Sequence, residues 1–182
     1  ELLRGSKSEM KQMRISVRKG DIMHFLEELS HIFDIVAGER EIDFIVNLED
    51  TEEEVWFSPS KLERILYNLL SNAFKYTQPG GYVKLSAKLI KEEKGTFVQI
   101  SVKDNGRGIP KEAQEQIFES YYQVEKRDHR EGFGLGLSLT RSLIHMHKGE
   151  IRVESEINKG SDFIVTLNVS EDAYNPDKRS SE

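Results

Sequence analysis

Two amides, a lysine and a tyrosine share one edge of a predicted helix within residues 68–77, NLLSNAFKYT. Asn68 and Asn72 are four residues apart and therefore project together, and Lys75 and Tyr76 continue the same edge one turn later. Amide oxygens can ligate a hard cation such as Mg²⁺, and a lysine can neutralise phosphate. The spacing indicates a site for magnesium and phosphate, although an isolated pair of asparagines more often bonds its own backbone.

The segment 104–110, DNGRGIP, offers a carboxylate followed by two glycines. Asn-Gly alone is the strongest hairpin signal, but the residues after it predict a helix and not a second strand. In the other interpretation Asp104 ends a strand, and its carboxylate accepts a hydrogen bond from the amino group of adenine, a donor that guanine lacks at that position. Gly106 and Gly108 then give the backbone room to approach the nucleotide, and Ile109 lines the base pocket.

A third segment, GFGLGL at 132–137, leads directly into a predicted helix. Gly132, Gly134 and Gly136 can present backbone N–H groups to phosphate at the positive end of that helix, with Leu135 and Leu137 beside them. The segment is not a Walker A loop, because no Gly-Lys-Ser or Gly-Lys-Thr ends it. A flexible hinge is the plainer interpretation of these glycines taken alone.

Together these segments resemble the catalytic, ATP-binding domain of sensor histidine kinases, in the superfamily that includes DNA gyrase, mismatch-repair ATPases and heat-shock chaperones. The match consists of the N box at 68–77, the G1 box at 104–110, the F box at 117–123 (IFESYYQ), the G2 box at 132–139 and the G3 position at 158–163 (NKGSDF). It runs from about residue 21 to residue 169. The resemblance implies an α+β fold of the Bergerat (GHKL) type: a two-layer α/β sandwich with a mixed sheet of about five strands and three helices on one face.

The resemblance also implies a pocket for ATP and Mg²⁺. In the family, the residue at the position of Asn72 ligates the metal, and Tyr122 anchors the start of a mobile lid over residues 124–131. Without the resemblance, that charged stretch reads as a solvated loop. The full predicted site comprises Asn68, Asn72, Lys75, Tyr76, Asp104, Gly106, Gly108, Ile109, Tyr122, Gly132, Gly134, Leu135, Gly136, Leu137 and Ser161.

Position 68 distinguishes activities within the superfamily. Gyrase-type ATPases have a glutamate at the equivalent position, where it serves as general base. This chain has Asn68, which cannot take a proton at neutral pH. We therefore expect ATP binding with poor hydrolysis, and transfer of the γ-phosphate to a histidine on a separate dimerisation domain. None of the five histidines of this chain lies in an acceptor motif, so no catalytic residue is predicted here beyond those that position ATP.

Three residues depart from the family pattern: Gln123 where many members have arginine, Asp162 where threonine is common, and Phe133 at a usually small, polar position. In the family, the arginine contacts the γ-phosphate. Gln123 therefore favours an alternative function, a nucleotide-binding pseudokinase or regulatory module without phosphotransfer.

Periodicity predicts the elements that position these motifs. Asp21 is expected to cap an amphipathic helix, and a second helix is expected to start at Ser58-Pro59. Further helices are predicted at 111–120 and 135–147, and strands at 41–48, 55–57, 82–90, 96–102, 150–155 and 162–169. Residues 1–20 are expected to be a linker or the end of a dimerisation region, 21–169 the catalytic domain, and 170–182 a disordered tail or linker.

Composition limits the partners. A chain of 182 residues with a net charge of −6 suits a single domain and argues against nucleic acid as a partner. The expected partners are ATP, the histidine-bearing dimerisation domain of the same protein, and a response regulator or receiver domain. We expect a cytoplasmic, monomeric piece of a homodimeric parent protein anchored in the inner membrane, with further domains on either side as in a hybrid sensor.

Overall fold

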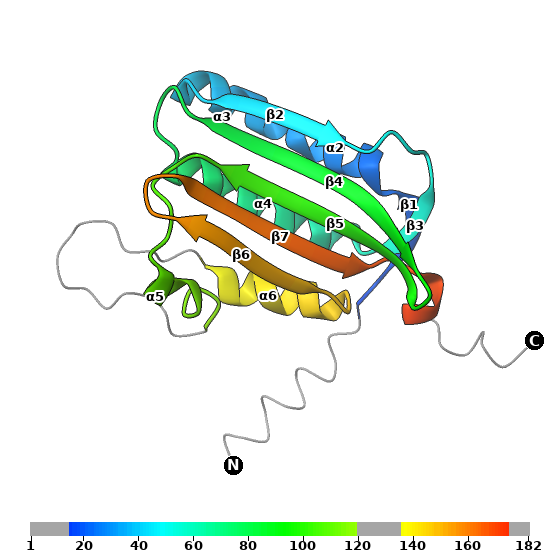
Figure 1. Ribbon diagram of the computed structural model, residues 1–182. Coiled ribbons are helices and arrows are strands. Elements are labelled where there is room, and N and C mark those ends of the chain that lie inside the picture. The colour runs from blue at the N-terminus through cyan, green and yellow to red at the C-terminus, as the bar shows by residue number, and fades with distance from the viewer. Residues whose placement is uncertain (1–14, 120–135, 175–182) are drawn as a thin grey trace, which may run out of the picture.

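The computed structural model describes residues 15–119 and 136–174, and it consists of one mixed sheet with helices on one face (Figure 1). The five strands lie in the order β2 (Asp43–Leu48), β4 (Tyr82–Glu92), β5 (Gly95–Asp104), β7 (Gly160–Asn168) and β6 (Glu150–Glu156). β2 runs parallel to β4, and the other neighbours are antiparallel. The predicted α+β sandwich is confirmed.

The helices α2 (Ile22–Ser30), α3 (Ile32–Arg40), α4 (Pro59–Tyr76) and α6 (Leu137–Met146) lie behind the sheet in Figure 1, and a short α5 (Lys111–Gln114) lies at its lower left. As predicted, the side chain of Asp21 caps α2, accepting a hydrogen bond from the backbone of His24. The single helix expected after Asp21 is divided at His31 into α2 and α3. Near the break, the buried Ser30 hydroxyl donates to the carbonyl of Glu27 at 2.6 Å, a contact of the kind that competes with helical bonding.

The hydrophobic core fills the space between the two layers. Side chains alternate along a strand, so every second residue of the central strands points to the helices, as with Val83 and Leu85 of β4. α4 packs against them with a buried stripe at helical spacing: Leu62, Ile65, Leu66, Leu69, Leu70, Ala73 and Phe74. This packing leaves the Asn68–Asn72 edge of α4 at the margin of the core.

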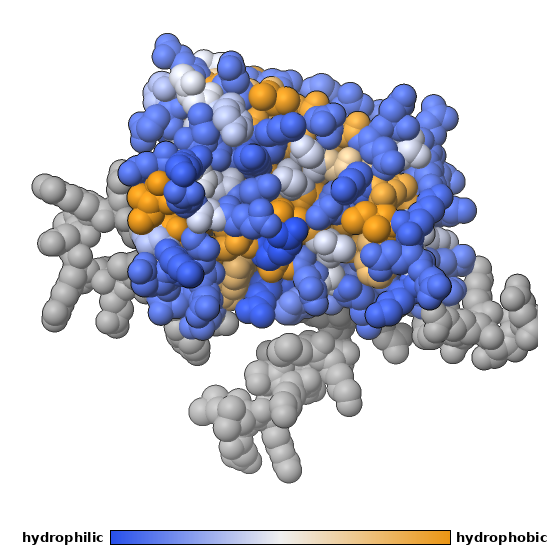
Figure 2. Space-filling view, in the orientation of Figure 1, coloured by the Kyte–Doolittle hydropathy of each residue, from blue (hydrophilic) through white to orange (hydrophobic). Residues whose placement is uncertain are grey.

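Among the described residues, no helix covers the opposite face of the sheet. Figure 2 shows it as a largely hydrophilic surface in which apolar side chains form separate patches. Polar residues of adjacent strands lie in register there, as with Asn47, Ser86 and Ser101. The predicted site residues Asp104 and Ser161 lie instead at strand ends, at the end of β5 and the start of β7.

Both ends of the described chain are more ordered than the sequence predicts. Residues 18–20, expected in a linker, belong to strand β1 (Arg18–Asp21), which pairs antiparallel with β3 (Glu54–Phe57). At the other end, residues 171–173 form a 3-10 helix, and the Tyr174 hydroxyl donates to the carbonyls of His147 (3.0 Å) and Asn168. The described fold thus extends beyond residues 21–169 at both ends.

Two further elements differ in length from expectation. The helix predicted over 111–120 is helical only in α5, and turns follow it to residue 119. β4 and β5 form a hairpin longer than predicted, closing at Gly95 with a φ of +130°. Among the described residues, no helix is long and apolar enough to cross a membrane.

Candidate functional site

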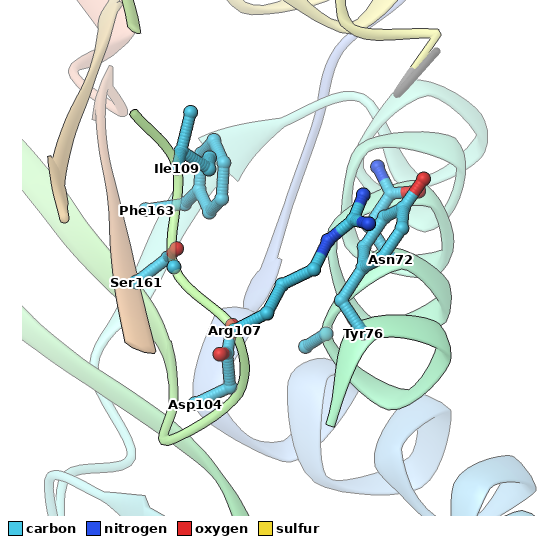
Figure 3. A pocket seen from close by; sticks show the side chains of 9 residues that line it. Asn72, Tyr76, Asp104, Arg107, Ile109, Ser161 and Phe163 are labelled. Atoms are coloured by element: carbon cyan, nitrogen blue, oxygen red, sulfur yellow. The ribbon is translucent and has the colours of Figure 1, made fainter. Parts of the chain in front are cut away.

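A pocket lies between the C-terminal half of α4 and the turn that follows β5 (Figure 3). Three segments far apart in sequence line it, from α4, from the 104–109 turn and from β7. The lining residues are Asn72, Ala73, Tyr76, Asp104, Arg107, Gly108, Ile109, Ser161 and Phe163. Six of the predicted site residues are therefore brought together in one place.

Asp104 is the sole acidic residue among the described residues that line this pocket, and it is only 5% exposed. The backbone N–H of Gly106 donates to its carboxylate at 2.8 Å. Burial raises the pKa of Asp104 to about 6, the backbone N–H groups of Gly106 and Ser161 oppose that rise, and the charge of Asp162 adds to it. At neutral pH the buried group is an ionised acceptor, suited to a ligand that brings an N–H donor.

The glycines of this turn are required by the close approach of the chain to itself. A Cβ on Gly106 would lie 2.3 Å from the carbonyl oxygen of Tyr76. A Cβ on Gly108, which has a φ of +72°, would lie 2.1 Å from the carbonyl oxygen of Glu156. Their predicted role in admitting a nucleotide stays a prediction, and Gly108 does line the pocket.

Ser161 is oriented by a hydrogen-bonded cluster beneath the turn. Its hydroxyl lies 2.8 Å from the hydroxyl of Ser155, which also accepts from the backbone N–H of Ile109 at 2.8 Å. Asp162 takes no part in the lining and instead accepts from Ser101 at 2.5 Å. Phe118, from the start of the F box, packs edge-on against Phe163 with ring centroids 6.4 Å apart.

The four predicted site residues of α4 do not all lie in the pocket. Asn72 and Tyr76 line the pocket, and Lys75 is exposed with its ammonium 5.3 Å from the centroid of the Tyr76 ring. Asn68 is turned toward α6, where its amide donates to the carbonyl of Gly136 at 3.1 Å and to the hydroxyl of Thr140 at 2.5 Å. Asn68 thus connects the two helices.

At the start of α6, Gly136 occupies the N-cap with a φ of +60°, and Leu137 is buried in the core. The predicted residues Tyr122, Gly132, Gly134 and Leu135 lie outside the described residues, as do the proposed lid and Gln123 and Phe133. Of the G2 segment, the structure therefore describes only residues 136–139, and the phosphate-binding role stays a prediction.

The sequence interpretation missed Arg107, Ala73, Phe163 and Thr140. Arg107 stands inside the DNGRGIP motif, and its guanidinium carbon lies 4.3 Å from the centroid of the Tyr76 ring. Ala73 and Phe163 look like ordinary core residues in sequence. Thr140 is buried, and its hydroxyl accepts a hydrogen bond from Asn68; neither feature is visible in the sequence.

Comparison with known proteins places these observations in a family. Residues 57–171 match the family described as "Histidine kinase-, DNA gyrase B-, and HSP90-like ATPase". The chain is 34% identical over 169 residues to the adaptive-response sensory kinase SasA of Crocosphaera subtropica, covering 93% of this chain and 44% of the relative. It is also 34% identical over 174 residues to the sensor histidine kinase WalK of Bacillus subtilis, covering 94% and 28%. The chain thus spans less than half the length of these relatives.

Solved structures agree. The catalytic domain of histidine kinase ThkA, in a nucleotide-free form, superposes with a TM-score of 0.72 and 27% identity, over 86% of this chain and 99% of that one. Full-length ShkA in complex with AMPPNP superposes with a TM-score of 0.74 and 27% identity, over 87% of this chain and 32% of that one.

Proposed function

This chain belongs to the family of histidine kinase-, DNA gyrase B- and HSP90-like ATPases, and from that premise we propose that it is the ATP-binding catalytic domain of a two-component sensor histidine kinase. Asp104 carries this proposal. A buried carboxylate at the end of β5, opposite Tyr76 and Asn72 of α4, provides an acceptor for the adenine amino group inside a pocket with apolar walls. Guanine presents a carbonyl at that position, so the pocket selects adenine.

The residues present fit Mg²⁺ bound together with phosphates. Magnesium keeps few protein ligands and takes the rest from phosphates and water. The described residues contain no cluster of three or more histidine, cysteine or acidic side chains that could bind a metal by itself. Asn72, an amide at the pocket wall, is the residue we assign to the ion, which would neutralise phosphate charge there.

Among its described lining residues, the pocket lacks a general base that could activate water. Asp104 is the sole acidic residue there, and it is assigned to the adenine ring. Asn68 cannot take a proton, and its amide is committed to α6. This composition favours holding ATP for transfer over hydrolysing it.

The histidines that the structure describes are engaged locally or lie away from the pocket. His24, on α2, is exposed and contacts Glu28 of the same helix at 3.3 Å, and His31, exposed between α2 and α3, contacts Asp34 at 3.1 Å. His147 is buried within the fold. We therefore assign the acceptor histidine to the dimerisation domain of the parent protein, which then passes the phosphate to a response regulator or receiver domain.

A groove between α4 and α6 offers a docking surface for that domain. Tyr67 and Leu139 line it and are 58% and 50% exposed. Asn68 lines the same groove, one turn of α4 before Asn72. A helix seated here would lie close to the nucleotide pocket. In the same proposal, the parent protein is a homodimer anchored in the inner membrane, and this domain lies on the cytoplasmic side.

The test uses the parent protein incubated with Mg²⁺ and γ-labelled ATP. We expect label on protein that survives base and is lost in acid, the behaviour of phosphohistidine. Asn72→Ala should abolish it, whereas Asn47→Ala, at an exposed asparagine on β2, should not. ATP binding without any label would overturn phosphotransfer and leave a binding module.

A further inference from the structure

Arg107 is the sole cation among the described residues that line the nucleotide pocket. Its guanidinium lies over the ring of Tyr76, on the side of the pocket formed by α4, where Asn72 also lies (Figure 3). Asp104, the acceptor assigned to the base, lies at the other end of the 104–107 turn. The positive charge is therefore on the Asn72 side of the pocket.

The backbone at Arg107 is fixed on both sides. Its N–H donates to the carbonyl of Tyr76 at 3.4 Å, and its carbonyl accepts from the N–H of Asn158 at 2.8 Å. The flanking positions 106 and 108 have no space for a side chain. Position 107 is thus the place in this turn from which a long side chain can enter the pocket, while its backbone is held in place.

The pocket in this arrangement is narrow. It contains about 20 Å³ of space, room for about one water molecule and too little for a purine. Tyr76 and Arg107 both line it, and the guanidinium rests on the ring, so displacement of Arg107 from the ring would enlarge that space. The Tyr76 hydroxyl is buried with no hydrogen-bond partner among the described residues, so this arrangement is not fully satisfied.

A guanidinium carries donors only, so it cannot serve the adenine amino group, which is itself a donor. The strongest acceptors on a nucleotide are its phosphate oxygens, which match the planar guanidinium in charge and geometry. We propose that Arg107 is a nucleotide-binding residue whose guanidinium leaves the Tyr76 ring when the base enters and donates to the phosphates beside Asn72. The assignment rests on the proposed function, because it requires an adenine nucleotide in this pocket.

The test compares Arg107→Met, which keeps the length and removes the charge, with Arg107→Lys, which keeps the charge and removes the planar donors. Affinities for adenosine, ADP and ATP are measured by titration calorimetry of the whole chain in Mg²⁺. Arg40→Met, at the exposed end of α3, is the matched control, and thermal melts check that each variant is folded.

Arg107→Met should weaken ADP and ATP binding about 10- to 100-fold, the range typical of a hydrogen bond to a charged group, and leave adenosine unchanged or tighter. Arg107→Lys should fall between Arg107→Met and the unaltered protein. An equal loss for adenosine and ATP would mean a contact with the base, and tighter binding of all three ligands would mean a simple plug. Either result, or no change, overturns the proposal. If the unaltered protein binds none of the three, the proposed function itself fails.

Discussion

Burial gives Asp104 the properties that the proposed recognition of adenine needs. Its carboxylate is desolvated, which raises its pKa to about 6, while the N–H groups of Gly106 and Ser161 favour the ionised form. A ligand that donates an N–H bond to the carboxylate also favours that form, so ligand binding and proton release are linked.

We therefore predict that adenine-nucleotide affinity is constant above pH 7 and falls below pH 6. With one linked proton the decline is at most about tenfold per pH unit. Titrations of adenosine, which has no phosphate that titrates in this range, between pH 5 and 8 measure this, and Asp104→Asn should bind weakly at every pH with no inflection near 6. A profile that is flat from pH 5 to 8 would show that Asp104 does not meet the base.

At the scale of elements, His147 connects the end of α6 to the start of α4. It is fully buried, and its Nε2 accepts from the backbone N–H of Ser58, the N-cap of α4, at 3.1 Å. Its Nδ1 lies 3.0 Å from the carbonyl of Leu143 and so carries the proton of a neutral imidazole. Burial lowers the pKa of His147, the bond to Leu143 opposes this, and the charge of Lys61 adds to it.

A histidine that the fold keeps neutral stabilises the folded state at pH values above its ordinary pKa of 6.5. That contribution is lost as the pH falls below this value. We predict that His147→Phe costs roughly 2–3 kcal/mol at pH 7.5, because the Ser58 N–H loses its partner, and that the difference shrinks at pH 5.5. Urea unfolding at the two pH values measures it. Both the unaltered protein and His147→Phe contain Asp104, so its contribution to the pH dependence cancels in the difference between them.

His145→Ala is the matched control, since His145 is exposed on the same helix. It should change the free energy of unfolding little at either pH. If the unaltered protein and His147→Phe lose equal stability between pH 7.5 and 5.5, the neutral-histidine account is wrong.

The second link between α4 and α6 is the pair Asn68–Thr140. Replacing Thr140 with valine removes an acceptor without changing shape, and we predict a loss of about 1 kcal/mol in the free energy of unfolding. Urea unfolding measures it. A Thr140→Val variant as stable as the unaltered protein would show that the bond to Asn68 contributes nothing.

The sequence predicts some elements better than others. Strands such as 82–90 and α4 are recognisable because their periodic apolar residues and the Ser58-Pro59 start are local signals. Three features cannot be recognised in this way: the division of the first helix at His31, the pairing of β1 with β3 and the docking of Tyr174. Each depends on contacts between distant segments. The same distinction applies to the predicted site. The motifs predicted Asp104 and Asn72, which line one pocket, but the positions of Arg107 and Thr140 become visible only when α4, α6 and the turn are assembled.

For the whole molecule, the two-layer arrangement places every lining residue of the pocket at one end of the sheet. We predict that Mg·ADP slows amide hydrogen exchange in the C-terminal half of α4 and in residues 104–109, and leaves β2 at the far edge unchanged. Mg·GDP should protect neither region. Protection concentrated on β2 or on the open face of the sheet would place the nucleotide elsewhere.

The most direct test of the central claim is calorimetric titration of this chain at pH 7.5 with Mg·ADP and Mg·GDP, repeated with Asp104→Asn. The account predicts that ADP binds with one site per chain. GDP should bind at least tenfold more weakly, because guanine has a carbonyl oxygen where adenine has the amino group that meets the carboxylate, and Asp104→Asn should remove the preference. Equal binding of ADP and GDP, or an Asp104→Asn variant that still prefers ADP, would contradict the assignment of this pocket to adenine.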